Sequence, residues 1–461
     1  MSESWKGKKV LILGLGQYPK GSGVSAALFV ARQGADVLVT DQKTEQDLAA
    51  NVKQLKRFKN VTFRLGEHRL EDIRWADVII RNPRVRPDSP EMKLATKLGK
   101  RVESDVSIFL KECRATVVGI TGTRGKSTTS TLVADMLKAS KKKVWLGGNI
   151  LVSPLTFADK VKPTDIVVLE LSSWLLETTG AAGISPHVAC VTNMMRDHLN
   201  TYEGMEDYAE AKAQVFRHQS MNDVVVLNGD DAYGKEWAIE APASVRLFTV
   251  KKRKGSNAWI EGNQLMLRYG HKNVEIAKIG QLKVFGAHNH LNMLAAALTA
   301  QASGANIPAI RSALKNFSGL QDRQEIVTVK RGITYINDTT ATTPDGTIAA
   351  LEALSPRFKK IHLILGGADK DLEFEGLARL AKRLKPDIVV LQGTAHDKML
   401  ASFKKVGVGH QDVASLKDAV ATLKSRAASG DAIVLSPGCA SFGQFKNEFD
   451  RGEQFRKLAK T

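Results

Sequence analysis

The chain has 461 residues and a formal net charge of +19, with 67 lysines and arginines against 48 aspartates and glutamates. Its hydrophobic share of 43% and charged share of 25% are close to those of an average soluble globular protein. No run approaches the roughly 18 apolar residues of a membrane span, and Met1–Lys6 precedes a strand-like run without a signal peptide's apolar segment. We therefore expect a cytoplasmic protein, and the length predicts about three domains.

The cysteines and the excess of lysine indicate the protein's surroundings. Cys113, Cys190 and Cys439 lie far apart and form no metal-ligand pair, as expected of reduced thiols in the cytosol. Basic runs such as Lys141–Lys143 and Lys251–Lys254 would either attract an anionic partner or form solvated surface. These two runs contain no aromatic residue on which a base could stack, so we favour solvated surface and do not expect nucleic-acid binding.

The first segment alternates strand-like and helix-like stretches. Its apolar strands are expected at 9–16, 36–41 and 77–80. Such alternation predicts a parallel sheet with helices on its faces, a Rossmann-like N-terminal domain over residues 1–110. Glycines at 14, 16, 21 and 23 suit a nucleotide-binding turn, but Pro19 stands where a dinucleotide pattern requires its third glycine. NAD is therefore not expected, and another nucleotide-type ligand stays open.

The second segment, a predicted central domain over 111–318, begins with a strand at 116–120 that runs into a glycine-rich loop and a helix. Further strands are expected at 165–170 and 187–192, then short strands with turns at 248–287 and a helix from about 289. This order predicts a P-loop ATPase-like domain with a small β region.

The third segment, 319–461, is again predicted to be α/β. Its strands are expected at 334–338, 361–367, 387–391 and 432–436. We expect a second Rossmann-like domain here, so the predicted fold class is α/β with three domains.

The sharpest local pattern is Gly119-Ile120-Thr121-Gly122-Thr123-Arg124-Gly125-Lys126-Ser127-Thr128, between a strand and a helix. Glycines let successive backbone N–H groups face phosphate oxygens at the positive end of the helix. Lys126 would add a mobile positive charge, and the Ser127 hydroxyl could bind Mg2+. The strict phosphate-loop pattern is not met, because Ile120 stands at its first glycine. The alternative is a glycine-rich turn without a ligand.

Polar residues also follow the neighbouring strands. Glu170 and the pair Asp197-His198 each come at the carboxyl end of a buried strand, where α/β sheets bind ligands. Lys212 lies in a helical run further on. Taken singly, His198 could be a structural histidine. Lys212 could be a solvated lysine on the surface of a helix.

Together these patterns resemble the Mur ligase family, in the family's order and along nearly the whole chain. The matching segments are Thr121–Thr128, Gly148-Asn149-Ile150, Leu169–Ser173, Asp197-His198, Ala211-Lys212, Gly286–Asn289 with Asn292, Arg323, Asn337-Asp338, Gly366–Lys370 and Ser436–Ser441. The region around Thr40-Asp41 and the tail from Ser441 to Gly452 are most similar to the branch that adds D-glutamate.

The resemblance implies an ATP-dependent ligase of peptidoglycan precursor synthesis. The implied ATP-binding residues are Gly122, Thr123, Gly125, Lys126, Ser127, Thr128, Asn292, Arg323 and Asp338. Two Mg2+ ions are implied, one on Ser127 and Glu170, the other on Glu170, His198 and a carbamate that CO2 forms on Lys212. Lys126, His198 and Lys212 would be the catalytic residues.

The implied substrates are UDP-N-acetylmuramoyl-L-alanine and D-glutamate. ATP would activate the carboxylate of the first as an acyl phosphate, which the amine of the second would attack. The implied substrate-binding residues are Asp41, Arg84, Asn149, Ser172, Thr342, Lys370, Ser441 and Phe442. No protein partner is implied, and we expect a monomer.

Several positions depart from the family's pattern, which leaves the choice of substrates open. Arg84 stands where a glycine is usual, Arg124 replaces an asparagine, and Thr339-Thr340 replaces a serine and a lysine. One alternative is a sister Mur ligase or folylpolyglutamate-type ligase that adds another amino acid. Another is a degenerate ligase that serves as a basic nucleic-acid-binding protein, although the presence of Lys126 and Glu170 argues against it.

Overall fold

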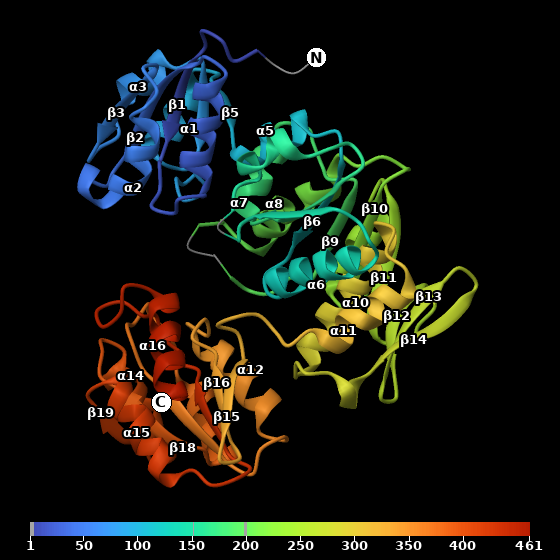
Figure 1. The fold of residues 1–461 in the computed structure, drawn as a ribbon, viewed down its shortest axis with the longest axis vertical. Coiled ribbons are helices and arrows are strands. Elements are labelled where there is room, and N and C mark those ends of the chain that lie inside the picture. The colour runs from blue at the N-terminus through green and yellow to red at the C-terminus, as the bar shows by residue number, and fades with distance from the viewer. Residues whose placement is uncertain (1–3, 151, 198–200) are drawn as a thin grey trace. The chain divides into compact units, whose positions relative to one another are not determined.

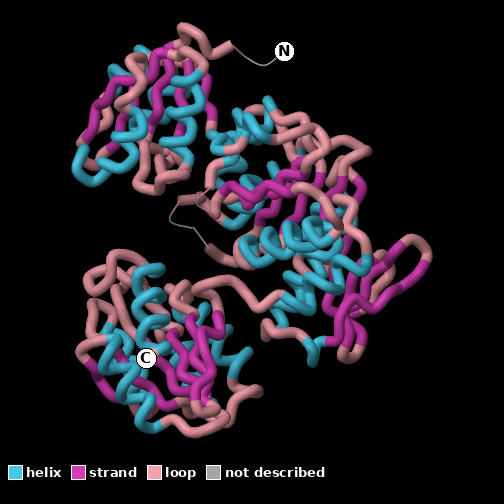
Figure 2. Tube along the Cα trace, in the orientation of Figure 1, coloured by secondary structure: helices cyan, strands magenta, loops and turns pink. Residues whose placement is uncertain are grey.

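The structure, a computed structural model, describes residues 4–150, 152–197 and 201–461. The chain forms three sheets with helices around them (Figures 1 and 2), which confirms the expected α/β class with three domains. It divides into two compact units, Met1–Gln281 with Leu291–Lys315 and Leu282–His290 with Asn316–Thr461. The expected domain limits at 110 and 318 stay predictions. No helix in the described ranges is long and apolar enough to cross a membrane.

The first sheet is parallel throughout, in the order β3-β2-β1-β4-β5. Its strands and helices are β1 (Lys9–Leu13), α1 (Ser22–Arg32), β2 (Asp36–Asp41), α2 (Glu45–Leu55), β3 (Val61–Leu65), α3 (Leu70–Trp75), β4 (Val78–Arg81), α4 (Pro90–Lys97), β5 (Arg101–Glu103) and α5 (Asp105–Glu112). Side chains along a strand alternate between the two faces. Val10 and Ile12 of β1 therefore join the core with α1 and α2, whereas Leu11 and Leu13 join that with α3 and α4.

The second sheet has nine strands in the order β14-β13-β12-β11-β10-β9-β6-β8-β7. The strands are β6 (Thr116–Thr121), β7 (Val144–Gly148), β8 (Ile166–Glu170), β9 (Val188–Val191), β10 (Val224–Asn228), β11 (Ser244–Lys251), β12 (Ser256–Glu261), β13 (Gln264–Tyr269) and β14 (Lys272–Lys278). The helices are α6 (Lys126–Ala139), α7 (Ser173–Ala181), α8 (Met205–Arg217), α9 (Ala232–Glu240), α10 (Ala287–Ala302) and α11 (Ile307–Asn316). The expected small β region is confirmed, and it extends the central sheet through the antiparallel strands β12, β13 and β14.

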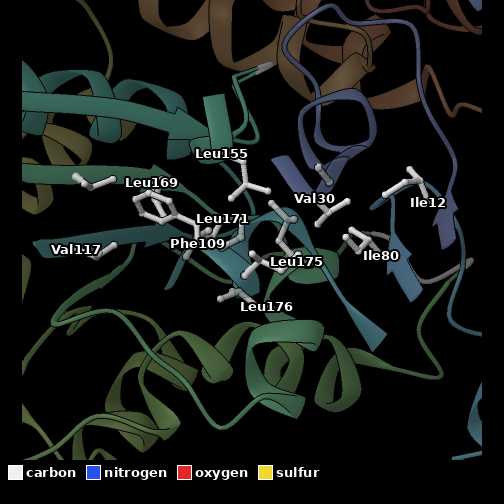
Figure 3. Packing of buried hydrophobic residues seen from close by; sticks show 14 of the residues in the cluster. Ile12, Val30, Ile80, Phe109, Val117, Leu155, Leu169, Leu171, Leu175 and Leu176 are labelled. Atoms are coloured by element: carbon white, nitrogen blue, oxygen red, sulfur yellow. The ribbon is translucent and has the colours of Figure 1, made fainter. Parts of the chain in front are cut away.

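One apolar core continues from the first sheet into the second (Figure 3). Ile12, Val30 and Ile80 come from the first sheet and its helices, whereas Leu155 and Leu175 come from the central domain. All five side chains are at most 5% exposed. Because burial of this apolar surface is favourable, it ties the two sheets of the first unit together.

The third sheet has the order β15-β16-β20-β17-β18-β19, and only its edge strand β15 is antiparallel to its neighbour. Its elements are β15 (Glu325–Lys330), β16 (Ile333–Asn337), α12 (Pro344–Leu354), β17 (Ile361–Leu365), α13 (Glu375–Leu384), β18 (Asp387–Leu391), α14 (His396–Val406), β19 (Gln411–Val413), α15 (Leu416–Arg426), β20 (Ala432–Leu435) and α16 (Glu448–Lys460). Separate apolar cores fill its two faces, one with Leu363 and Leu365 and the other with Ile364. The second Rossmann-like sheet is thus confirmed.

Candidate active site

The glycine-rich loop lies between β6 and α6, as expected for a phosphate loop. Gly122 and Gly125 have φ angles of +136° and +83°, a region that favours glycine. A Cβ at Gly122 would overlap the Thr192 hydroxyl, and one at Gly125 would overlap the side-chain amide of Asn292. Asn292 lies on α10 and is 6% exposed. The structure therefore brings Asn292 against the loop, where sequence reasoning expected a nucleotide ligand.

Two lysine side chains meet on one carbonyl of this loop. The Nζ atoms of Lys126 and Lys212 donate to the Gly122 carbonyl oxygen at 3.0 and 3.1 Å. Lys126 also donates to the Thr123 carbonyl at 3.0 Å. Lys126 brings a positive charge to the N-terminus of α6, so the site favours an anion such as a phosphate.

Lys212 lies on α8, is 1% exposed, and points its Nζ over the Tyr208 ring at 4.5 Å from the centroid. Burial lowers the pKa of Lys212 well below its ordinary value, and the nearby charge of Lys126 lowers it further. The neutral amine is thereby favoured. Since the neutral form of an amine is its nucleophilic form, Lys212 is suited to react with CO2.

Glu170 ends β8 beside the loop, because Ile120 of β6 is its partner in the register. The side chain is 2% exposed, and its Oε1 accepts a hydrogen bond of 3.0 Å from Asn149. Within the described part of the chain, nothing donates to the buried Oε2. An unsatisfied buried carboxylate oxygen is costly unless a cation binds it, so Glu170 fits a Mg2+ ligand, with the Ser127 hydroxyl in the first turn of α6 as its expected partner.

The second expected Mg2+ site depends on His198, which lies outside the described residues. Among residues 4–150, 152–197 and 201–461, no group of three His, Cys, Asp or Glu side chains is arranged to hold a metal. Of the two other expected ligands, Glu170 offers a carboxylate oxygen, whereas Lys212 qualifies only as a carbamate. The second ion and the role of His198 therefore stay predictions.

A cavity of about 860 Å³ lies at the carboxyl ends of the first sheet and is shared with the central domain. Among its lining residues are Asp41, Arg84 and Asn149, three of the expected substrate ligands. Asp41 is engaged within the protein, since it accepts the backbone N–H groups of Gly16 and Lys43, each at 2.9 Å. The Arg84 side chain is exposed.

Ser172 does not line this cavity. Its hydroxyl is the N-cap of α7 and accepts the Leu175 N–H at 3.3 Å. In the described structure it therefore begins the helix that follows Glu170. A substrate contact by Ser172 remains a prediction.

Asp338 follows β16 in the second unit and is 6% exposed. Its Oδ2 accepts the Ser436 hydroxyl at 2.7 Å and its Oδ1 accepts the Gln324 N–H at 3.1 Å. Burial raises the pKa of Asp338 to about 7, against the smaller opposite effects of these hydrogen bonds and of the exposed Arg323. A buried carboxyl group whose pKa is strongly raised by desolvation is typical of a functional site.

Asp338→Asn should stabilise the ligand-free protein at alkaline pH. A folded-state pKa of about 7 lies above the ordinary 3.8, so the stabilising effect of the protonated group is complete at low pH and is lost as the pH rises through 7. We expect the variant to exceed wild type by on the order of 3 kcal/mol at pH 8.5, with the difference shrinking towards pH 4.5 and disappearing only below the ordinary pKa of 3.8. Urea unfolding across this range measures it, and an equal difference at both pH values would contradict the account.

The expected amino-acid ligands Lys370, Ser441 and Phe442 come together on two neighbouring loops. Ala368 and Ala440 pair through two backbone hydrogen bonds of 2.8 and 3.2 Å. The Lys370 Nζ lies 5.0 Å from the centroid of the Phe442 ring, which is 58% exposed, whereas Ser441 is 2% exposed. Thr342 lies on the loop after Asp338, where its N–H donates to the Thr340 carbonyl at 2.9 Å, and its substrate contact stays a prediction.

Arg451 of α16 holds these loops together. The side chain is fully buried, and its guanidinium donates to the Thr339 hydroxyl and carbonyl and to the Cys439 and Ala440 carbonyls. Burial lowers the pKa of Arg451 to about 10. Arg451 was noted beforehand only as part of the family's tail pattern, because its partners lie 11 to 112 positions away.

Comparisons with known proteins show which family the chain resembles. Three family models match the chain: "Mur ligase MurD-like, N-terminal domain" over residues 8–104, "Mur ligase middle domain" over 120–300 and "Mur ligase, glutamate ligase domain" over 322–439. The UDP-N-acetylmuramoylalanine–D-glutamate ligases of Roseiflexus sp. and Acetivibrio thermocellus are 39% and 35% identical. They align over 99% of this chain and over 99% and 97% of their own lengths.

Solved structures share the fold. UDP-N-acetylmuramate-alanine ligase MurC from Thermotoga maritima superposes with a TM-score of 0.62 at 21% identity, covering 98% of this chain and 99% of that one. MurF from Acinetobacter baumannii gives a TM-score of 0.65 at 16% identity, covering 98% and 93%.

The chain belongs to the Mur ligase family. It is accordingly an ATP-dependent ligase that forms an amide bond to an amino acid.

Proposed function

We propose that this enzyme joins D-glutamate to UDP-N-acetylmuramoyl-L-alanine, with conversion of ATP to ADP and phosphate, as a cytoplasmic monomer in peptidoglycan precursor synthesis. The observation that carries the chemistry is the convergence of Lys126 and Lys212 on the Gly122 carbonyl beside the unsatisfied oxygen of Glu170. The choice of substrates is supported by full-length relatives named as D-glutamate ligases, at 34–39% identity.

In the proposed reaction a carboxylate oxygen of the acceptor attacks the γ-phosphorus of ATP, and ADP leaves. The D-glutamate amine then attacks the acyl carbon, and phosphate leaves with the former carboxylate oxygen. Lys126 would exchange the Gly122 and Thr123 carbonyls for phosphate oxygens, and loop N–H groups would hold the same oxygens. Mg2+ at Ser127 and Glu170 would supply further positive charge to the phosphates.

Lys212 would act as an anionic ligand. Its neutral amine attacks the carbon of CO2, a C–N bond forms, and the amine proton passes to solvent, which leaves a carbamate. The reaction replaces an amine with an anionic oxygen donor, the type of ligand that Mg2+ prefers. Burial supports this role, because the neutral amine is the reactive form.

The acceptor would occupy the 860 Å³ cavity, with its diphosphate near Arg84. Arg84→Gly should raise the apparent KM for the UDP-linked acceptor by about fivefold, since an exposed charge-assisted hydrogen bond is worth on the order of 1 kcal/mol. The KM for ATP should stay unchanged, as should both constants in Arg57→Gly, an exposed arginine outside the cavity. Initial rates of ADP release test this, and an unchanged acceptor KM would show that Arg84 only faces solvent.

D-glutamate would bind beside Lys370, Ser441 and Phe442. The threonines after Asp338 offer fewer free hydroxyl donors to a carboxylate than expected. The Thr340 hydroxyl already donates to the Asp322 carbonyl at 2.9 Å. The Thr339 hydroxyl likewise donates to the Glu448 carbonyl at 2.8 Å. This pocket is therefore short of donors for the second carboxylate of D-glutamate.

Thr340→Lys should lower the KM for D-glutamate by about tenfold, since a charged hydrogen bond to a carboxylate contributes roughly 1.5 kcal/mol or more. Ser425→Lys adds the same charge at an exposed position of α15 and should leave this KM unchanged. Saturation curves for D-glutamate at fixed ATP and acceptor measure both. A KM that rises in Thr340→Lys would place the second carboxylate elsewhere.

The test of the proposed function is ADP release from the acceptor with D-glutamate, L-alanine, meso-diaminopimelate or L-glutamate as the amine. We expect turnover to saturate with D-glutamate alone. Turnover with L-alanine or diaminopimelate and none with D-glutamate would assign the enzyme to a sister activity.

A further inference from the structure

Arg81 ends β4, directly before the cavity-lining loop 82–85, and is 3% exposed. Its guanidinium donates to three acceptors on two segments: the Val85 carbonyl at 3.1 Å in the loop after β4, and the Trp174 carbonyl at 3.0 Å and the Glu177 carboxylate at 2.9 Å on α7. Val85 and Trp174 both line the cavity, one from the N-terminal sheet and one from α7 of the central domain. A single side chain thus connects two walls of the cavity.

Glu177 continues the connection. Its Oε2 accepts from Arg81, and its Oε1 accepts the Tyr202 hydroxyl at 2.8 Å. The Tyr202 ring packs against that of Tyr208 with centroids 5.1 Å apart. Tyr208 in turn lies 3.5 Å from the Thr123 hydroxyl of the phosphate loop. Buried side chains therefore run from the acceptor cavity to the loop.

Packing alone does not account for this ion pair. The desolvation of the buried Arg81 and the partly buried Glu177 offsets much of their attraction, so apolar residues of similar size would often stabilise the protein as well. An arginine fork, however, fixes direction as well as distance, because its planar donors each require an acceptor in place. The pair is suited to hold the cavity walls in register.

We propose that Arg81 and Glu177 are positioning residues for the acceptor. They hold the 82–85 loop and the start of α7 at the spacing that the UDP-linked substrate requires, so their loss weakens acceptor binding selectively. The inference rests on the proposed function in that this cavity takes the acceptor. Neither residue contacts the reacting atoms.

The test compares Arg81→Met, Glu177→Gln, the double variant and Arg81→Lys with wild type. Glu177→Gln can keep the Tyr202 hydrogen bond but puts an amide N–H or a weaker acceptor against Arg81. We expect each of the first two variants to raise the acceptor KM about tenfold and to leave the KM for ATP within twofold. The double variant should be no worse than the worse single one, since both disrupt one pair, and Arg81→Lys should recover part of the loss.

Calorimetric binding of UDP alone gives a readout independent of turnover and should weaken in parallel. Arg64→Met, which removes the Arg64–Asp72 pair of the same sheet away from the cavity, is the control and should keep wild-type constants. Thermal unfolding identifies variants that fail to fold. If Arg81→Met is one of them, the acceptor KM and UDP affinity of Arg81→Lys are compared with those of wild type instead. Unchanged acceptor KM and UDP affinity in folded variants, or additive effects in the double variant, would overturn the proposal. Wild-type enzyme that binds no UDP would instead overturn the proposed function.

Discussion

Lys126→Ala is expected to lower the rate of ATP-dependent ligation by on the order of a thousandfold while the protein stays folded. Lys126 is the side chain nearest the helix N-terminus that can deliver a positive charge to the transferred phosphoryl group, and it already rests on two loop carbonyls. It is partly exposed and packs in no apolar core, so its removal should leave the thermal unfolding temperature almost unchanged. Coupled ADP release at saturating substrates measures the loss.

Lys138→Ala is the matched control, because Lys138 is an exposed lysine near the other end of the same helix α6. It should retain wild-type turnover. If folded Lys126→Ala kept a tenth or more of wild-type activity, the loop would not be the phosphate site.

Lys212 should require CO2 for its function. We expect removal of CO2 and bicarbonate to lower turnover by about tenfold or more, with recovery when bicarbonate returns, because only the carbamate can bind a cation beside Glu170. Lys212→Arg should be inactive under both conditions, since a guanidinium stays cationic and forms no such carbamate. Labelled bicarbonate followed by carbon-13 NMR should give a carbamate signal in wild type.

Lys212→Ala should lose this signal, whereas Lys235→Ala, which alters an exposed lysine of α9, should retain it. Full activity of Lys212→Arg, or turnover that is insensitive to bicarbonate, would refute the carbamate. A fully active Lys212→Arg would assign Lys212 a cationic role at the loop. Turnover that is insensitive to bicarbonate, with Lys212→Arg inactive, would assign the role of a neutral amine.

Features set by neighbouring residues were predictable from the sequence. The apolar run Asp36–Asp41 was expected as a strand and is one, because a β-branched run buried on both faces has few other stable arrangements. The glycine-rich turn between β6 and α6 was also expected from its glycines. In the structure Gly122 and Gly125 adopt positive φ angles, and a side chain at either position would collide with Thr192 or Asn292. In such segments local geometry determines which residue types are possible.

Contacts between distant segments were not predictable. Arg81 is 96 positions from Glu177, and a charged residue at the end of an apolar strand was the only signal. Arg451 likewise gains its partners only when the loops after β16 and β20 meet. The role of the Thr340 hydroxyl was also beyond the sequence, because it donates to the Asp322 carbonyl 18 positions away. The Ser172 cap is local, since its hydroxyl accepts the Leu175 N–H, and serine is a common residue at that position.

The central claim is that ATP activates the acceptor carboxylate before D-glutamate attacks it. The most direct measurement follows oxygen-18 from the labelled carboxylate of UDP-N-acetylmuramoyl-L-alanine during turnover with ATP and D-glutamate. We predict that mass spectrometry finds one labelled oxygen in the released phosphate and the other in the new amide of a D-glutamyl product. Phosphate without label, or a product that lacks D-glutamate, would contradict the account.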